Sequence, residues 1–169
     1  MSEVPEQHRS EAPPSVGCAV ITVSDTRTLE TDTGGQTAVD RLTAAGHRVL
    51  VREIIRDEPE PMRRLLLELR DRDDVDAVLL TGGTGLGSRD RTCETVDAVL
   101  DKPLPGYGEL FRMLSYEQIG PAAMLSRATG GLAGRTVVLT MPGSRKAVEL
   151  AMEKIILLEL GHLVREARR

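Results

Sequence analysis

The first half of the chain alternates predicted strands with amphipathic helices, and this order limits the fold more than any other feature. Residues 17–23 form an unbroken apolar run, GCAVITV, which is typical of a strand buried on both faces of a parallel sheet. Further strands are predicted over residues 49–55 and 75–80, with helices between them. The order strand–helix–strand–helix–strand predicts an α/β fold with a doubly wound, mostly parallel sheet and helices on both faces.

The two predicted helices carry their own start and stop signals. Residues 33–36 read Thr-Gly-Gly-Gln, which matches a capping box, and Gly46 is a favourable C-terminal stop. Two prolines open the second helix. Its apolar side chains are spaced along one face, at Met62, Leu65, Leu66 and Leu69.

The second half of the chain predicts a mixture of helices and strands. The expected elements are a short helix (95–100), a Pro- and Gly-containing loop (102–108), a helix (110–118), an edge strand (126–131) paired with a late strand (135–140), and a closing helix (144–167). The closing helix is apolar over most of its surface, and helices of this kind are buried. We therefore expect the chain to form an oligomer.

Length and composition fit one domain over residues 17–169, preceded by a disordered tail over residues 1–16 that is rich in Pro, Glu and Ser. The net charge is −4 and aromatic residues make up 2% of the chain, which argues against a nucleic-acid partner. Cys18 and Cys93 lack metal-ligand spacing, which indicates a reducing cytoplasm. No apolar run reaches the roughly 18 residues that span a bilayer. We expect a cytoplasmic protein without a membrane partner.

Polar or glycine-rich segments follow each predicted strand of the parallel sheet. They are, in chain order, Ser24 and Asp25, then Asp57, then residues 81–90, and finally Pro142, Gly143 and Ser144. In open α/β sheets, ligands bind outside the carboxyl ends of the strands. We therefore expect these segments to meet in one site.

Residues 81–90, hereafter the glycine loop, are the most specific of these segments. Their glycines allow backbone N–H groups to point at an anion, and their hydroxyls add donors. The expected anion-binding residues are Thr81, Gly82, Gly83, Thr84 and Gly85. Ser88 stands where a Walker A loop has Lys, and Asp90 stands where a dinucleotide fingerprint has Gly or Ala.

Asp90 has two interpretations. A carboxylate next to bound phosphates favours a bridging Mg²⁺, because Mg²⁺ is usually held by one or two carboxylates and phosphate oxygens. The alternative is a simple turn in which Asp90 caps a helix that starts near Thr92.

Asp57 and Ser144 have equally simple alternatives. Asp57 precedes the prolines of the second helix, and the residues alone favour a helix cap there. Ser144 opens the closing helix, where the free N–H groups either bind an anion or are capped by Ser144 itself. Taken together, the residues predict a Mg²⁺-assisted nucleotide or phosphate site.

The segment 81–92, TGGTGLGSRDRT, resembles the MoaB/Mog family of molybdenum cofactor biosynthesis proteins, which bind molybdopterin. Further matching segments occur in the family's order, at residues 23–25, 105–109, 125–127 and 141–144. The resemblance runs from about Gly17 to the end of the closing helix. Cys93 departs from the pattern, since the family often has Pro there, a residue that suits a first helical turn.

The resemblance implies that the chain adenylylates molybdopterin with ATP and Mg²⁺, which prepares molybdopterin for molybdate insertion. Asp57 and Asp90 match the family's two essential acidic positions, which implies catalytic and Mg²⁺-binding roles for both. The glycine loop and residues 142–144 match substrate-binding segments. Glu109 matches a further acidic position, and Ser24 and Asp25 complete the expected substrate-binding set.

Two alternatives to this activity stay open. Some family members do not catalyse adenylylation, so the first is a non-catalytic molybdopterin-binding or carrier protein. The second is a nucleotide pyrophosphatase, as in competence-damage-related proteins of the same fold. The resemblance also implies a trimer or hexamer, and hand-over of the product to a molybdate-inserting enzyme.

Overall fold

The computed structural model describes residues 13–169, which form a six-stranded sheet with the order β2-β1-β3-β6-β5-β4. Four neighbouring strands are parallel: β2 (Arg48–Ile55), β1 (Gly17–Val23), β3 (Ala77–Thr81) and β6 (Thr136–Met141). Two shorter strands continue the sheet in antiparallel pairing: β5 (Gly130–Ala133) and β4 (Lys102–Pro103). The predicted mostly parallel sheet is confirmed.

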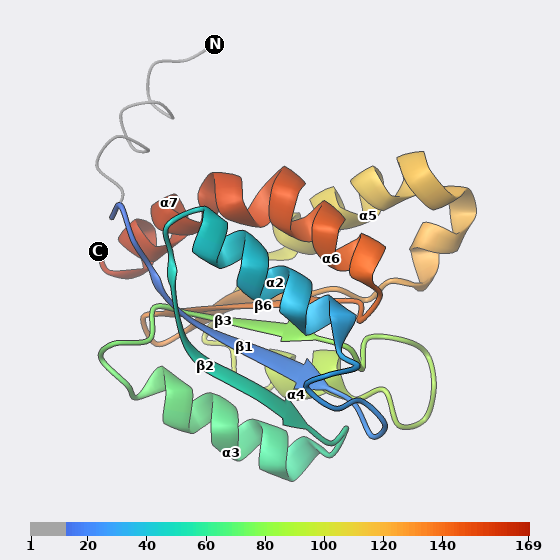
Figure 1. Cartoon of the computed structure of the whole chain (residues 1–169), viewed down its shortest axis with the longest axis horizontal. Coiled ribbons are helices and arrows are strands. Elements are labelled where there is room, and N and C mark those ends of the chain that lie inside the picture. The colour runs from blue at the N-terminus through green and yellow to red at the C-terminus, as the bar shows by residue number, and fades with distance from the viewer. Residues whose placement is uncertain (1–12) are drawn as a thin grey trace.

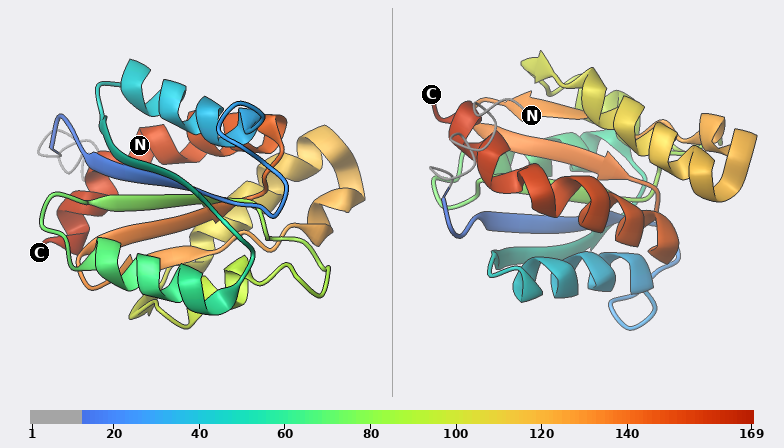
Figure 2. Two further views of the ribbon diagram at one scale, coloured as in Figure 1. Left: turned by 60° about the horizontal axis from the view of Figure 1, so that its bottom comes forward. Right: turned by 90° about the horizontal axis from the view of Figure 1, so that it is seen from above.

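Helices cover both faces of this sheet (Figure 1, Figure 2). One face carries α2 (Thr33–Ala44), α5 (Pro105–Ile119) and the closing helix, which runs through α6 (Arg145–Ala151), the π-helical turn η2 (Met152–Ile156) and α7 (Leu157–Ala167). The other face carries α3 (Pro59–Arg70) and α4 (Thr92–Asp97). The 3-10 helix η1 (Gly120–Leu125) follows α5. This arrangement is the predicted doubly wound fold.

Strand β1 explains why its sequence is apolar without alternation. Cys18 and Val20 belong to the core between the sheet and α2, α5 and the closing helix. Ala19 and Ile21 belong to the core on the other face, with Met62, Leu66 and Leu69 of α3. Because successive side chains of a strand point to opposite faces, a strand covered on both sides needs an apolar residue at every position.

Helix α2 begins one residue earlier than the predicted capping box requires. Its N-cap is Asp32, whose Oδ1 accepts a hydrogen bond from the Gly35 N–H at 3.0 Å. Thr33 is the first helical residue, so its predicted role as the cap is wrong. Asp competes well for this position because a short carboxylate reaches the free N–H groups of the first turn. Gly46 follows the helix with a φ of +83°, as predicted for a C-terminal stop.

Helix α5 starts five residues earlier than predicted, at Pro105 rather than residue 110. The expected loop over residues 102–108 is therefore wrong, since it contains β4 and the first turn of α5. Proline is compatible with a first helical turn because it lacks only an N–H that has no partner there. Gly108 lies against the Ala128 carbonyl, where a Cβ would collide. Helix α4 likewise starts at Thr92, three residues before its predicted start.

Val16 belongs to the folded core and not to the tail expected over residues 1–16. Residues 1–12 of that tail lie outside the described residues, whereas Val16 is fully buried in the core. The Val16 N–H donates to Nδ1 of His47 at 3.3 Å, and the Val16 carbonyl accepts from the Arg48 N–H at 3.0 Å. The predicted boundary at residue 16 is corrected accordingly. Among residues 13–169, no helix is long and apolar enough to cross a membrane.

The closing helix does not provide the exposed apolar surface on which oligomer formation was predicted. Most of its apolar side chains are buried within the chain, Leu157 and Leu163 are partly buried, and Leu158 is its exposed large hydrophobic residue. The exposed large hydrophobic residues gather instead on α5 and η1, and this α5–η1 apolar surface consists of Leu110, Met113, Tyr116, Ile119, Met124 and Leu125. The premise drawn from the closing helix was wrong, and the oligomer itself stays a prediction.

Candidate functional site

A cavity of about 620 Å³ opens at the carboxyl ends of the parallel strands. Its walls come from the segments that follow β1, β3 and β6, and from one side of α5 and η1. The predicted site residues among its lining are Ser24, Gly82, Gly83, Thr84, Gly85, Asp90, Pro142, Gly143 and Ser144. Because parallel strands end at the same edge, segments far apart in the sequence meet there.

Gly82 fixes the start of the glycine loop between two strand ends. Its N–H donates to the Met141 carbonyl of β6 at 3.0 Å, and its φ is +95°. A Cβ at this position would collide with the Val23 carbonyl of β1. Glycine is therefore required here, both for the left-handed backbone and for the close approach of β1.

Asp90 closes the glycine loop rather than capping α4. Its Oδ2 accepts a hydrogen bond from the Gly87 N–H at 2.8 Å. A Cβ at Gly85 would lie 2.7 Å from the same oxygen, so the carboxylate lies across the loop. The N-cap of α4 is Arg91, which makes no side-chain capping bond. The alternative in which Asp90 caps the following helix is wrong.

Asp57 reaches the same loop from the end of β2. Its Oδ1 accepts from the Arg91 N–H at 3.2 Å, and a Cβ at Gly83 would lie 2.7 Å from its Oδ2. The N-cap of α3 is Glu58, which makes no side-chain capping bond, so the capping interpretation of Asp57 is wrong as well. Asp57 is absent from the lining of the cavity and supports the loop from another side.

The pKa of Asp57 is raised above its ordinary value. Burial is the largest cause, and the negative charges of Asp90 and Asp25 add to it, while the Arg91 N–H and the Arg89 cation act in the opposite direction. A carboxylate that is held close to other carboxylates is costly unless a cation lies nearby. This repulsion is typical of a cation site.

Asp25 and Ser24 connect the β1–α2 segment to the site. Asp25 pairs with Arg89 of the glycine loop at 2.9 Å, and both residues are exposed. The Ser24 hydroxyl accepts from the N–H groups of Thr26 and Arg27 at 3.2 and 3.1 Å. Ser24 therefore fixes the local backbone and lines the main cavity, whereas Asp25 links the segment to the glycine loop and does not line the cavity.

Thr81 and Glu109, which were expected to bind substrate, do not line the cavity. Thr81 is fully buried at the end of β3, and its hydroxyl has no hydrogen-bond partner among the described residues. Glu109 is exposed on α5 and does not line the cavity. Substrate binding by either side chain stays a prediction.

Ser144 combines both of the roles considered for it. Its hydroxyl accepts from the Ala147 N–H at 3.3 Å, so it is the N-cap of α6. Pro142, Gly143 and Ser144 also line the cavity. The start of the closing helix thus faces the cavity, where its free N–H groups favour an anion.

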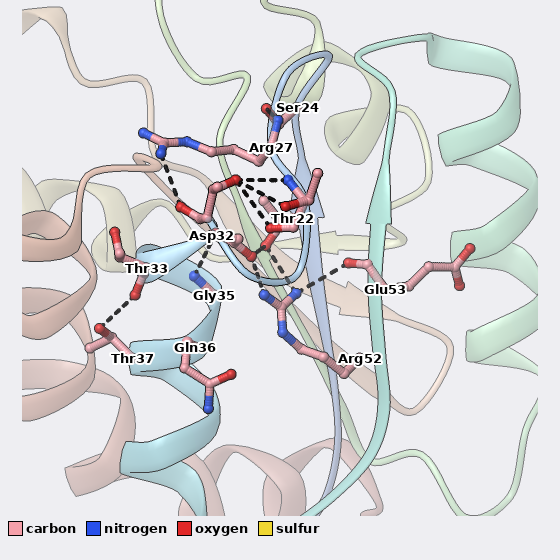
Figure 3. A network of polar contacts seen from close by, with 12 residues as sticks. Thr22, Ser24, Arg27, Asp32, Thr33, Gly35, Gln36, Thr37, Arg52 and Glu53 are labelled. Atoms are coloured by element: carbon pink, nitrogen blue, oxygen red, sulfur yellow. Dashed lines mark hydrogen bonds and ion pairs between the residues drawn. The ribbon is translucent and has the colours of Figure 1, made fainter.

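A buried network beside the cavity was not predicted (Figure 3). Thr22 donates to Oδ2 of Asp32 at 2.6 Å, and Arg52 of β2 contacts both residues, with Nη1 on Thr22 at 3.1 Å and Nη2 on Asp32. Burial acts to raise the pKa of Asp32, but the hydrogen bonds from Thr22, the Gly35 N–H and Arg52 outweigh it and hold that pKa below its ordinary value. The acidic residue directly before the predicted helix was the available signal.

The wall formed by α5 and η1 was also missed. Phe111, Ser115 and Ile119 line the cavity at intervals of four residues, and Leu125 and Ser126 continue the wall. That spacing places the three side chains on one face of a helix. The helix expected over residues 110–118 already contains Phe111 and Ser115, so the wall was missed because its place beside the strand ends depends on contacts between distant segments.

The described residues contain no group of three or more His, Cys, Asp or Glu side chains placed to hold a metal ion. Two carboxylates at the carboxyl edge of the sheet remain compatible with a cation that a bound phosphate would also help to hold.

Comparison with known proteins identifies the family. Residues 19–162 match a family model described as a probable molybdopterin binding domain. Molybdenum cofactor biosynthesis protein B of Bacillus cereus is 52% identical over 164 residues, which cover 96% of this chain and 97% of that protein. The chain belongs to the MoaB/Mog family. As a MoaB-type protein, it functions in molybdenum cofactor biosynthesis.

Solved structures of MoaB proteins share its fold. A crystal structure of a molybdenum cofactor biosynthesis protein B has a TM-score of 0.90 at 52% identity, and covers 94% of this chain and 99% of its own. The MoaB protein of Pyrococcus furiosus, described as tungsten cofactor synthesizing, has a TM-score of 0.82 at 36% identity and covers 94% and 100%. The MoaB/Mog fold predicted from the resemblance is confirmed.

Proposed function

We propose that this MoaB-type protein is a molybdopterin adenylyltransferase that uses ATP and Mg²⁺. The observation that carries the proposal is the meeting of Asp57 and Asp90 at the glycine loop. The two carboxylates come from different strand ends, and neither caps the helix that follows it. Their mutual repulsion contributes to the raised pKa of Asp57, which favours a shared cation over a purely structural role.

Asp57 and Asp90 would hold Mg²⁺ together with phosphate oxygens of ATP. The residues fit this ion, because Mg²⁺ is usually bound by one or two protein carboxylates and by substrate phosphates. When bound, Mg²⁺ would neutralise the charge that develops on the phosphates. The glycine-loop N–H groups and the start of the closing helix provide donors for the phosphate of molybdopterin.

The reaction needs no protein nucleophile or general base. An oxygen of the molybdopterin phosphate attacks the α-phosphorus of ATP, the bond between the α-phosphorus and its bridging oxygen breaks, and pyrophosphate leaves. A phosphate monoester is already ionised near pH 7, so no proton has to be removed first. The protein therefore acts mainly by positioning the reactants and stabilising charge. The 620 Å³ cavity is within the usual range for a small-molecule site.

Single-turnover formation of adenylylated molybdopterin tests the proposal. At saturating Mg²⁺, Asp90→Asn and Asp57→Asn should each lower the rate by roughly a thousandfold. Molybdopterin binding should be retained, because the pterin phosphate contacts backbone N–H groups. Asp73→Asn is the matched control, since that side chain is fully exposed and lies outside the cavity.

Three outcomes would contradict the proposal in different ways. Product formation that survives both substitutions would show that the cation site is placed wrongly. Tight molybdopterin binding by the unmodified protein without any product would favour the carrier function. Release of pyrophosphate from a nucleotide without transfer to molybdopterin would favour the pyrophosphatase function.

We further propose that the protein acts as a homo-oligomer, a trimer or hexamer, and that it hands its product to a molybdate-inserting enzyme. The family resemblance implies both. The exposed α5–η1 apolar surface supports self-association, because exposed apolar residues gathered on neighbouring elements usually mark a contact.

A further inference from the structure

Arg127 connects three parts of the site through one guanidinium group. Its Nη2 donates to the Asp90 carbonyl at 2.8 Å, and its Nε lies 3.4 Å from the Thr84 carbonyl. Its Nη1 pairs with the carboxylate of Glu94 on α4. Arginine is suited to this task because its planar group carries five N–H donors in a fixed arrangement.

The glycine loop has few other supports along its length. It contains no helix or strand after Thr81, and four of its residues are glycines, which lose the most conformational freedom when they are ordered. The Gly82 N–H at the start of the loop donates to the Met141 carbonyl of β6. The Thr92 N–H, just beyond the loop, donates to the Gly83 carbonyl at 3.1 Å. Within the loop, the Asp90 N–H donates to the Gly87 carbonyl at 3.0 Å. Arg127 is the side chain that holds the loop backbone at both Thr84 and Asp90.

The backbone of Arg127 is itself held by α4. The Cys93 thiol of α4 donates to the Arg127 carbonyl at 3.0 Å. The two preceding residues, Leu125 and Ser126, line the cavity. The guanidinium therefore links the wall after η1 to the wall formed by the glycine loop.

We infer that Arg127 is a positioning residue, which holds the glycine loop against the η1 wall and thereby fixes the place of the Asp90 carboxylate. This inference rests on the proposed function for its catalytic consequence, but not for its structural one. A loop that loses this support samples other conformations, and misplacement of a reacting or charge-stabilising group by about 1 Å can cost roughly a hundredfold in rate.

Amide hydrogen exchange of the peptide covering residues 82–91 tests the inference without any substrate. Arg127→Met keeps a long apolar side chain and removes the guanidinium. Exchange should accelerate about tenfold at the Gly87, Asp90 and Arg91 amides, each of which is hydrogen-bonded, and stay unchanged in β1 and β3. Arg127→Lys should restore only part of the protection. Its ammonium group keeps the positive charge but cannot reproduce the planar arrangement of N–H donors of the guanidinium.

Two further variants test whether loop protection depends on the hydrogen bonds from Arg127 to the two carbonyls or only on its charge. Glu94→Gln removes the ion pair of Arg127 and leaves the contacts to Thr84 and Asp90, so loop exchange should stay near that of the unmodified protein. Arg135→Met makes the same chemical change at an exposed side chain far from the loop and should have no effect there. Identical loop exchange in Arg127→Met and Arg135→Met would overturn the inference.

The catalytic consequence is measured separately. Arg127→Met should lower the kcat of adenylyl transfer by roughly a hundredfold and change KM much less, with the Lys variant in between. An unchanged kcat in a protein whose loop exchanges faster would overturn the link to Asp90. Faster loop exchange in a protein whose unmodified form makes no adenylylated product would uphold the positioning of the loop and overturn the proposed function instead.

Discussion

Asp57 is placed where its negative charge is unfavourable to the folded state. It is partly buried, and the nearby negative charges of Asp90 and Asp25 further raise its pKa. A group with a raised pKa in the folded chain binds its proton more tightly there than in the unfolded chain. The stability that this proton contributes is full below the unfolded pKa and is lost as the pH rises through the folded pKa.

Asp57→Asn should therefore be at least as stable as the unmodified protein at pH 7, while adenylyl transfer falls. The Asn carbonyl oxygen can still accept the Arg91 N–H, and the repulsive charge is gone. The gain should vanish below the ordinary pKa of 3.8, where Asp57 itself is protonated. Thermal melts between pH 3 and pH 8 measure this, with Asp73→Asn as the exposed control. A lower melting temperature at pH 7 would show that Asp57 has a structural role.

At the scale of single elements, helix α2 depends on the network at its N-terminus. Asp32 caps the helix through the Gly35 N–H and pairs with Arg52 of β2, so it also fixes α2 against the sheet. The side chain of Asp32 is only 4% exposed and that of Arg52 17%. Removing one member of a buried pair is costly because the other charge stays buried.

Asp32→Ala should lower the free energy of unfolding by about 3 kcal/mol at neutral pH. Because the pKa of Asp32 is lowered in the folded chain, this contribution is present above the ordinary pKa of 3.8 and is lost as the pH falls through the folded pKa. Urea denaturation at pH 7 and in acid measures both effects. The control Asp40→Ala changes an exposed residue of the same helix and should cost less than about 0.5 kcal/mol. Equal losses in the two variants would contradict the role of the network.

At the scale of the whole molecule, the apolar surfaces decide how copies of the chain meet. The closing helix is covered by α2, α5 and the sheet within one chain, whereas the α5–η1 apolar surface has no cover in residues 13–169. Self-association should therefore use the α5–η1 apolar surface.

Light scattering at micromolar concentration should give a trimer or hexamer. Met113→Glu should shift the mass toward the monomer, because it places a charge in the contact. Leu158→Glu is the matched control, since Leu158 is 62% exposed on the closing helix and should leave the mass unchanged. A monomer in the unmodified protein, or dissociation by Leu158→Glu alone, would contradict the prediction.

Local patterns in the sequence determined most of the fold. The unbroken apolar run of β1, the apolar face of α3 and the stop at Gly46 each follow from a physical preference that acts within a few residues. Where the prediction failed, two local preferences competed. Pro105 and Gly108 indicate a loop as readily as a first helical turn, and the close approach of Gly108 to Ala128 is a contact between distant segments.

For the candidate site, too, some features follow from the sequence alone and others only from contacts in the tertiary structure. The sequence by itself determined which segments follow the strands and meet at one edge, because parallel strands must end together. Only the tertiary structure decided what the acidic side chains contact: Asp57 and Asp90 precede helices, as capping residues do, yet each accepts an N–H of the 87–91 backbone instead. It likewise decided that Asp32 meets Arg52 and that Arg127 meets the glycine loop. The contacts of Asp57, Asp32 and Arg127 join residues 20 to 43 positions apart, and no local preference encodes them, whereas the contact of Asp90 with Gly87 spans only three positions.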